Sequence, residues 1–398
     1  MELKFSTFNT PILLISDNPC LYGGLSRMCR DLASLCATLP DFRVGVLGRG
    51  TGQRRKLPWI TYDFPETGQW GEGFIEHAWN DLSGGQPGVI ITLDDPSRRL
   101  WFANPVGLPE NLQRFLGPGR NFRKWGYFPL DSTGPNGVTL PTEAVSTISG
   151  YDRALASSEW GYKMLLQSFP PHANIDWLPH GIIGSVFKIH PGGRTLWNDV
   201  EKTWGTTVGC VMANQSRKDF PAAFECFAVL KHHYGNDFKA WLHTDTPLRY
   251  WNVYALATDY GVTDCLTVTS NLSDESLSML YSACDCTFLP SAGEGFGYPI
   301  AESMFCGTAC VVTDYGGGAE LVSEDCRVPP VAYRVDTQHN CRRAVLSGYA
   351  FAEKVKEQVQ RKKDDWEYRA KEIAHSVEHL NWANLKHLWV NWMKAGLR

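Results

Sequence analysis

No apolar run in this 398-residue sequence approaches the roughly 18 residues that a membrane-spanning helix requires. The first residues, MELKFSTFNTP, also lack the charged and then apolar stretches of a signal peptide, so no secretion signal is expected. Charge is nearly balanced at a formal net value of -4, which gives no global attraction to nucleic acid or to an anionic membrane. These absences predict a cytoplasmic protein that would meet a membrane only at its surface.

The twelve cysteines also lack a metal-binding pattern, because no two of them form a CxxC pair and the nearest pair is Cys284 and Cys286. Several lie inside apolar runs, where a free cysteine behaves as a small hydrophobic residue. We interpret them as buried, reduced thiols, which agrees with a cytosolic compartment. No Cys/His spacing supports zinc, and no metal site is predicted.

Short apolar runs alternate with longer amphipathic segments along the whole chain. Continuous apolar runs indicate strands that are buried on both faces, as in a parallel sheet covered by helices. The expected strands are 11–16, 42–48, 88–93, 125–130, 153–157, 206–213, 238–243, 265–269, 286–290 and 309–313. Helical patterns are expected between them, as at 25–39 and 220–234, and near the end of the chain at 338–363 and 381–394.

This alternation breaks and restarts near residue 185, so the two halves of the sequence have the same pattern. We therefore predict an α/β protein with two doubly wound, Rossmann-like domains. The first domain is expected to cover residues 1–185 and the second residues 186–375.

The motif with the most chemical information, PSAGEGFGYPIAESMFCGTACVVTDYGGGAELV, covers residues 290–322. A predicted strand ends at its first residue, and a glycine-rich loop then leads into a helix. Such a loop can aim backbone N–H groups at a phosphate, at the edge where open α/β sheets bind ligands. Glu294 and Glu302 are eight residues apart, so one carboxylate can lie at the mouth and the other deeper on the same face. Carboxylates suit sugar and ribose hydroxyls because they accept hydrogen bonds strongly.

This stretch resembles the E-x7-E region of retaining GT-B glycosyltransferases of family 4. The matching residues are Glu294, Gly295, Phe296, Gly297, Pro299, Glu302, Met304, Gly307, Thr313 and Gly317. The resemblance implies that Glu294 orients the donor sugar, that Glu302 holds the ribose, and that the backbone from Gly295 through Phe296 to Gly297 completes the sugar's cradle. It also implies a GT-B arrangement, with the donor in an interdomain cleft and a C-terminal helix, 376–398, that crosses back to the first domain.

A basic pair follows the first strand of the second half, within the segment 214–221. Arg217 and Lys218 resemble the family's site for the donor diphosphate, although the family usually spaces these two cations more widely. Two cations at the end of a strand can neutralise a departing diphosphate. The prediction is therefore that the donor, a nucleotide diphosphate sugar, needs no divalent metal and no further cofactor.

Further donor contacts are implied by weaker parts of the resemblance. Gly23 and Gly24 match the family's N-terminal glycine loop, where the missing side chain lets the backbone approach the donor phosphate or the acceptor. The loop at Leu272 matches the position that contacts the nucleotide base. His180, in the segment LPHGI that resembles the closing segment of the first domain, is interpreted as a hinge or packing residue rather than a catalyst.

The first half departs from the family, because it has no clear match to the histidine that many members place near the sugar. Asp131 is the candidate for that role; otherwise it caps a turn or contacts the acceptor. Arg98, Arg99, Arg123 and Lys124 lie among aromatic residues. Cations with aromatics suit an anionic acceptor, either a lipid-linked glycan or a nucleic acid. The alternative is a solvated basic face over buried aromatic rings.

The resemblance thus implies an enzyme that transfers a hexosyl or pentosyl group from a nucleotide diphosphate sugar to an acceptor hydroxyl with retention of configuration, the acceptor being a glycan or a lipid-linked sugar. Three alternatives stay open at the level of sequence. The acceptor could be a hydroxylated base in a nucleic acid. The chain could be a GT-B epimerase or a related phosphorylase. It could also bind a nucleotide sugar without turning it over.

Overall fold

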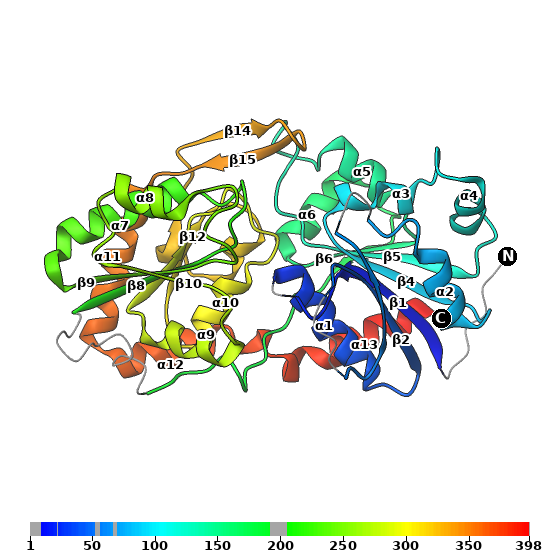
Figure 1. The fold of residues 1–398 in the computed structure, drawn as a ribbon, viewed down its shortest axis with the longest axis horizontal. Helices are drawn as coiled ribbons and strands as arrows, with labels where there is room; N and C mark the ends of the chain where they lie inside the picture. The colour runs from blue at the N-terminus through cyan, green and yellow to red at the C-terminus, as the bar shows by residue number, and fades with distance from the viewer. Residues whose placement is uncertain (1–8, 22, 52–55, 67–69, 192–204, 398) are drawn as a thin grey trace. The chain divides into compact units, whose positions relative to one another are not determined.

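The structure is a computed structural model that describes residues 9–21, 23–51, 56–66, 70–191 and 205–397 (Figure 1). The chain forms two compact units, each with its own parallel sheet. The first unit contains Met1–Pro179, Thr337–Cys341 and Lys386–Arg398. The second contains His180–Asp336 and Arg342–Leu385. Two α/β units with parallel sheets agree with the Rossmann-like fold that the sequence predicts.

The first unit has a seven-stranded parallel sheet in the order β3-β2-β1-β4-β5-β6-β7. Its strands are β1 (Thr10–Asp17), β2 (Phe42–Arg49), β3 (Ile60–Phe64), β4 (Gly88–Leu93), β5 (Phe122–Phe128), β6 (Arg153–Ala156) and β7 (Ile175–Trp177). Its helices are α1 (Gly24–Ala37), α2 (Ile75–Ser83), α3 (Leu100–Ala103), α4 (Glu110–Leu116), α5 (Thr142–Ile148) and α6 (Glu159–Ser168). The short strands β3 and β7 were not predicted from the sequence.

The central strand β1 shows why this sheet carries helices on both faces. Its four residues from Ile12 to Ile15 have no exposed surface. Successive side chains of a strand point to opposite faces. Leu13 and Ile15 belong to the same apolar cluster as Trp79 and Leu82 of α2. The alternate side chains, Ile12 and Leu14, must therefore be covered on the other face.

The final helix, α13 (Trp382–Leu397), supplies aromatic side chains to the first unit. The rings of Trp389 and Tyr127 meet edge to face at 5.0 Å, and those of Trp392 and Trp125 at 5.1 Å. Arg153 of β6 donates to the carbonyl of Trp392 at 2.8 Å. This part of the Trp-rich stripe is therefore core packing, and its helical spacing presents both indoles to the same strand.

The second unit repeats the topology with a six-stranded parallel sheet in the order β10-β9-β8-β11-β12-β13. Its strands are β8 (Thr206–Val211), β9 (Phe238–His243), β10 (Leu266–Thr269), β11 (Cys286–Leu289), β12 (Cys310–Thr313) and β13 (Arg327–Val328). Its helices are α7 (Phe220–Tyr234), α8 (Val253–Asp259), α9 (Asp274–Ala283), α10 (Tyr298–Phe305), α11 (Gly348–Asp364) and α12 (Trp366–Ser376).

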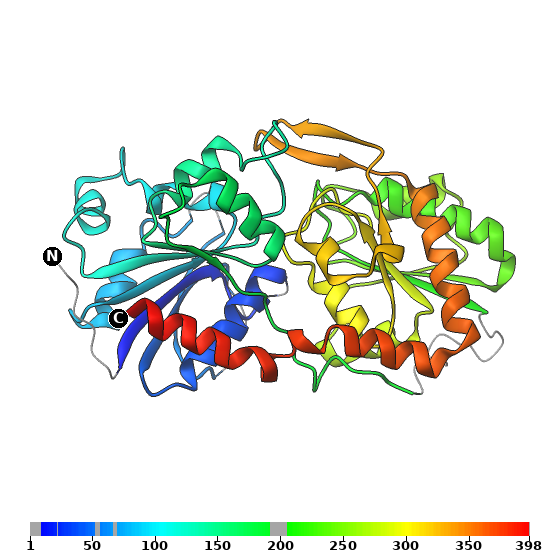
Figure 2. The ribbon, with the colours of Figure 1, turned by 180° about the vertical axis from the view of Figure 1, so that it is seen from behind.

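Side chains of strand β11 pack against helices on both faces of this sheet. Phe288 contacts Phe227 of α7 at 5.2 Å and Phe351 of α11 at 6.1 Å between ring centroids, so these helices share one face. Figure 2 shows α11 lying across that face. The preceding residue, Thr287, hydrogen-bonds to Ser303 of α10 at 2.6 Å and so faces the other way. The glycine-rich loops that follow β11 and β12 contribute to the candidate site.

One predicted helix is wrong in its first part. Residues 338–363 were expected to be helical, but the structure has a two-stranded hairpin, β14 (Ala332–Asp336) and β15 (Cys341–Val345), before α11 begins at Gly348. Asn340 turns the hairpin with a positive φ of 47°. The Ser347 hydroxyl accepts from the Ala350 N–H at 3.3 Å and caps the helix there. Because strand pairing depends on partners elsewhere in the chain, local helical periodicity misassigned this segment.

The cysteines are buried, as the sequence predicts. All twelve are free thiols, and all except Cys20 are buried. Burial raises the pKa of the Cys36 and Cys310 thiols to about 12, so both stay protonated near neutral pH. Among the described residues, no helix is both long and apolar enough to cross a membrane.

The imidazole of His243, the last residue of β9, makes the stability of the second unit sensitive to acid. Burial lowers the pKa of His243 from 6.5 to about 4, and the carboxylate of Asp245 only partly opposes this shift. The unfolded chain therefore binds more protons than the folded chain between these two values. The free energy of unfolding must fall as the pH falls through this window.

We predict that His243→Gln removes about 2 kcal/mol of the destabilisation that the wild type shows between pH 7 and pH 5. Urea unfolding at several pH values measures the slope of the free energy of unfolding against pH. The matched control is His172→Gln, because His172 is exposed and should leave the slope unchanged. Equal slopes for the wild type and His243→Gln would show that this imidazole does not cause the effect.

Candidate functional site

The candidate site lies where the strand order of the second sheet reverses. The chain proceeds from β8 to β9 in one direction and from β11 to β12 in the other, and β8 and β11 are neighbours. Connections that leave adjacent parallel strands in opposite directions open a crevice at the strands' carboxyl ends, where open α/β sheets bind ligands. Arg217 and Lys218 follow β8, and Glu294 follows β11. The topology alone therefore brings the predicted cations and carboxylate to one place.

Lys218 and Glu294 form an ion pair in the interior of this crevice. The Lys218 ammonium donates to Glu294 Oε1, and Arg217 Nη2 lies 3.8 Å from Glu294 Oε2. Lys218 is only 4% exposed. Burial by itself would raise the pKa of Glu294, but the charges of Lys218 and Arg217 outweigh it and hold that pKa below its usual range. Glu294 is therefore ionised at neutral pH.

Backbone contacts fix the two loops to each other. The N–H of Ala292 donates to the carbonyl of Arg217 at 2.9 Å, and the N–H of Asp219 donates to the carbonyl of Pro290 at 3.0 Å. Lys218 also forms an isolated antiparallel bridge with Ser291. These main-chain bonds hold the backbones of Lys218 and Glu294 close to each other.

Two glycines of a third loop support the backbone of Glu294. Gly316 has φ of 88°, and a Cβ added there would lie 2.6 Å from the carbonyl oxygen of Glu294. A Cβ on Gly318 would lie 3.1 Å from the Cβ of Glu294. The N–H of Gly317 donates to the Glu294 carbonyl at 2.7 Å. The glycine run after β12 is therefore needed for close approach to the loop that carries the carboxylate.

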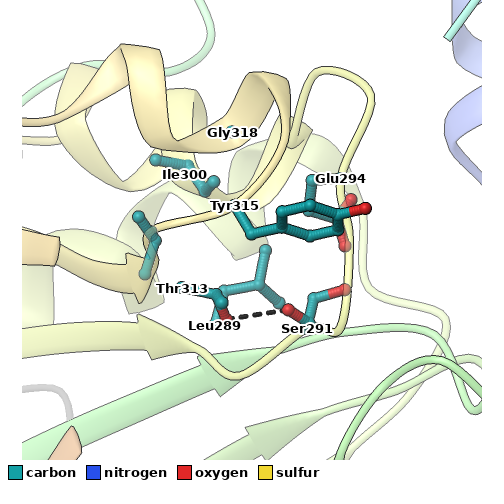
Figure 3. A pocket seen from close by; sticks show the side chains of 8 residues that line it. Leu289, Ser291, Glu294, Ile300, Thr313, Tyr315 and Gly318 are labelled. Carbon is teal, nitrogen blue, oxygen red and sulfur yellow. Dashed lines mark hydrogen bonds between the residues drawn. The ribbon is translucent and has the colours of Figure 1, made fainter. Parts of the chain in front are cut away.

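A small pocket opens beside Glu294 (Figure 3). Its lining residues are Leu289, Ser291, Glu294, Ile300, Val312, Thr313, Tyr315 and Gly318. It encloses about 180 Å³ of empty space, counting space open to solvent. The enclosed part of this space is only about the size of one water molecule, so the pocket is a shallow hollow open to solvent rather than a closed cavity. Apolar and polar groups both line it.

Glu302 is not one of the residues that line this pocket. It is on α10, only 2% exposed, and accepts a hydrogen bond from the Tyr281 hydroxyl at 3.1 Å. Gly297, with φ of 88°, directly precedes α10, and Phe296 and Gly295 are buried next to it. Leu272 is partly buried against the apolar core of the unit. The predicted donor roles of these residues stay predictions.

The first unit holds the remaining predicted residues. Gly23 precedes α1 with φ of 141°, and a Cβ there would meet nothing within 4 Å, so the space beside it is open. Gly24 is the first residue of α1. Asp131 follows β5 and is half-buried. Its predicted role in place of the family's histidine is untested by this geometry.

The predicted acceptor cations do not form one exposed surface. Arg99 has no exposed surface and pairs with Asp94 at 2.6 Å. Lys124 is 2% exposed and donates to the Phe102 carbonyl at 2.5 Å. Arg123 donates to the carbonyl of Gly396. Arg99 and Lys124 are therefore buried side chains with partners inside the first unit, which does not suit contact with an acceptor. Arg123 is half-buried, and its predicted acceptor contact stays a prediction.

Arg98 is different, because its side chain is 30% exposed. It lies 3.1 Å from Asp94, and its guanidinium stacks 4.7 Å from the ring centre of Trp70. Arg49 stacks on the same indole at 4.3 Å. Asp94 and Arg49 lie at the carboxyl ends of β4 and β2, so Arg98 is held at the ligand-binding edge of the first sheet.

Seven of the eight lining residues were not predicted as ligand contacts from the sequence, and those of them with polar side chains are Ser291, Thr313 and Tyr315. Thr313 Oγ1 donates to the Ser291 carbonyl at 2.7 Å, which ties β12 to the loop of Glu294 (Figure 3). A signal was present, because each of the three residues ends a predicted strand or follows one within two residues, at the edge where ligands bind.

Residues 249–367 match the protein family described as Glycosyl transferases group 1. Among curated relatives, the chain is 36% identical over 70 residues to the MMP alpha-(1->4)-mannosyltransferase of Mycolicibacterium hassiacum, which is 18% of this chain and 17% of that protein. It is 30% identical over 138 residues to the serotype-specific mannosyltransferase WbdA of Escherichia coli, 34% of this chain and 15% of that protein. The aligned segments thus span less than a fifth of either relative.

Solved structures resemble the chain over almost its whole length. Sucrose-phosphate synthase from Thermosynechococcus elongatus superposes with a TM-score of 0.73 at 18% identity, covering 98% of this chain and 99% of that one. Anabaena Alr3699/HepE in complex with UDP-glucose gives 0.72 at 14% identity, covering 97% and 100%. At these identities the likeness shows the fold alone.

The chain therefore has the fold of the GT-B glycosyltransferases, two Rossmann-like units. Within it, residues 249–367 are similar to the group 1 glycosyltransferases. That segment contains Glu294, Glu302 and the pocket residue Tyr315, while Arg217 and Lys218 come before it.

We predict that Lys218→Met destabilises the protein by about 2–3 kcal/mol, because it leaves the buried carboxylate of Glu294 without its main partner. The double variant Lys218→Met/Glu294→Gln should recover much of this loss, since it removes both charges. Urea unfolding of the four proteins in this cycle measures the coupling.

The control is Lys231→Met, because Lys231 pairs with the exposed carboxylate of Asp264 at 2.6 Å. A surface pair of this kind should contribute less than about 1 kcal/mol. Additive costs for the Lys218 and Glu294 substitutions would contradict an ion pair that stabilises the site.

Proposed function

We propose that the protein is a glycosyltransferase that moves a hexosyl group from a nucleotide diphosphate sugar to an acceptor hydroxyl, with retention of configuration, as in family 4. The observation that carries the proposal is the cluster of Arg217, Lys218 and Glu294 beside a small pocket at the strand-order reversal of the second sheet. The match of residues 249–367 to group 1 glycosyltransferases supports it.

The two cations would bind the diphosphate. A diphosphate that leaves the sugar gains negative charge, and fixed positive charges next to it lower the energy of the transition state. Arg217 is the more accessible of the two, with 27% of its side chain exposed against 5% for Lys218. We infer that Arg217 meets the diphosphate directly, while Lys218 divides its charge between the diphosphate and Glu294. In this scheme the cations take the place of a divalent metal.

Glu294 would orient the sugar by accepting hydrogen bonds from its hydroxyls. The lowered pKa of Glu294 keeps the carboxylate ionised, so it accepts hydrogen bonds and does not act as a general acid. An ionised acceptor forms stronger bonds to hydroxyl groups than a neutral one. Glu302 is proposed to hold the ribose, Leu272 to contact the base, and the backbone from Gly295 to Gly297 to complete the donor site.

The first unit would recognise the acceptor. Gly23 and Gly24 offer open backbone, and Arg98 at the carboxyl edge of the first sheet is the accessible cation for an anionic group on a glycan or lipid-linked sugar. Asp131 is proposed to act near the reacting sugar. UDP-glucose and GDP-mannose are the donors to test first, because a structural neighbour was solved with UDP-glucose and two curated relatives are named mannosyltransferases.

We predict that Glu294→Gln and Lys218→Met each lower the rate of sugar transfer by at least about 100-fold, because each removes a charge that the transition state needs. Thermal shift with UDP-glucose and GDP-mannose identifies the donor, and release of the nucleoside diphosphate measures turnover. Lys231→Met is the control and should keep wild-type activity. Full activity in both site variants would refute the assignment, and wild-type protein that binds no nucleotide sugar would refute the function.

We also predict that the product keeps the anomeric configuration of the donor. NMR of the glycoside product distinguishes the anomers by the signals of the anomeric centre, whose configuration is fixed once the glycosidic bond has formed. A product of the opposite configuration would exclude a retaining mechanism. An altered nucleotide sugar formed without any acceptor would instead indicate an epimerase.

A further inference from the structure

The hairpin of β14 and β15 is joined to the donor pocket by two hydrogen bonds. The N–H of Ala344 donates to the carbonyl of Ala292, two residues before Glu294, at 3.1 Å. The hydroxyl of Tyr315, which lines the pocket, donates to the carbonyl of Arg342 at 2.8 Å. The hairpin therefore holds both the loop of Glu294 and the side chain of Tyr315.

Aromatic and cationic groups of the hairpin fix the Tyr315 ring further. The ring of Tyr333 on β14 meets it edge to face, with 5.4 Å between centroids and 65° between planes. The guanidinium of Arg342 lies 3.8 Å from the centre of the Tyr333 ring. Edge-to-face pairs and cation–π contacts each favour a single orientation. Tyr315 is thus held by the hydrogen bond of its hydroxyl group and by the contact of its ring with Tyr333.

This arrangement decides which part of Tyr315 a ligand can meet. Its hydroxyl is directed to the carbonyl of Arg342, so the side chain offers its ring to the pocket (Figure 3). Glu294 lines the same pocket with an ionised carboxylate. A pocket with an aromatic ring and a strong hydrogen-bond acceptor suits a ligand that has both C–H faces and hydroxyl groups. A pyranose ring has this character.

We propose that Tyr315 is a specificity-determining residue that packs against the C–H face of the donor's hexose, and that the β14–β15 hairpin holds it there. This inference rests on the proposed function, because it names the residue of that site that would distinguish one donor sugar from another. Tyr333 is assigned as a positioning residue that acts through Tyr315.

The test measures the affinity of purified protein for a nucleotide sugar and for the matching nucleoside diphosphate by calorimetry. The probes are UDP-glucose with UDP and GDP-mannose with GDP, and the pair that binds wild type is used. Tyr315→Ala should weaken binding of the nucleotide sugar about tenfold, equal to about 1.4 kcal/mol, and leave binding of the nucleoside diphosphate unchanged. Tyr315→Phe, which keeps the ring, should lie close to wild type.

Tyr368→Ala is the matched control, because Tyr368 is 63% exposed on α12, away from the pocket residues. It should bind both probes as wild type does. Equal loss of both probes in Tyr315→Ala, or no loss of either, would overturn the role of the ring. Wild type that binds neither nucleotide sugar would instead defeat the proposed function, so the two failures are distinguishable.

The positioning role of Tyr333 is tested with the double variant. If Tyr333 acts only through Tyr315, then Tyr333→Ala should weaken the nucleotide sugar alone, and Tyr315→Ala/Tyr333→Ala should bind no more weakly than Tyr315→Ala. Additive losses would show that Tyr333 contributes independently and would overturn this assignment.

Discussion

The ion pair between Lys218 and Glu294 is the interaction on which the site depends. Each charge lies in a largely buried position, where an isolated ion is strongly unfavourable. The two loops that carry them leave neighbouring strands in opposite directions, and the pair gives these loops a common fixed point. The same contact keeps Glu294 ionised, so one pairing determines the position and the charge state of the carboxylate. A diphosphate would enter a site where both signs of charge are already in place.

The cluster of Arg217, Lys218 and Glu294 could be predicted because its residues lie in two local motifs, although its donor role stays a proposal. Residues 290–322 hold the strand end, the glycine turn and both glutamates in one continuous motif, and Arg217 and Lys218 follow another predicted strand. The fold then needs only the Rossmann strand order to bring the two segments together. What the motif did not reveal is the partner of the deeper carboxylate: Glu302 does not line the pocket and accepts a hydrogen bond from Tyr281, which lies on a different helix.

The acceptor side could not be predicted in the same way, because a sequence shows charges without their partners. Arg99 and Lys124 have the spacing of a basic surface, yet Arg99 pairs with Asp94 and Lys124 bonds the Phe102 carbonyl in the interior. Burial of a cation requires such a partner, and each partner belongs to another element of the fold. The hairpin was missed for the same reason, since β15 is a strand only through its pairing with β14.

The proposed donor site has two parts, the charged loops and Tyr315, and different elements of the fold hold them. The charges that would hold a diphosphate lie in loops fixed by main-chain bonds at the sheet edge, where a change would disturb the core. Tyr315 is fixed instead by a hairpin whose outer residues are well exposed, Val335 to 48% and Tyr333 to 41%. Substitutions on the exposed strand β14 change few buried contacts and so have little effect on stability, whereas β15 is largely buried. If the pocket binds the donor sugar as proposed, substitutions on β14 would change its fit to that sugar while the charged loops and the sheet stayed the same.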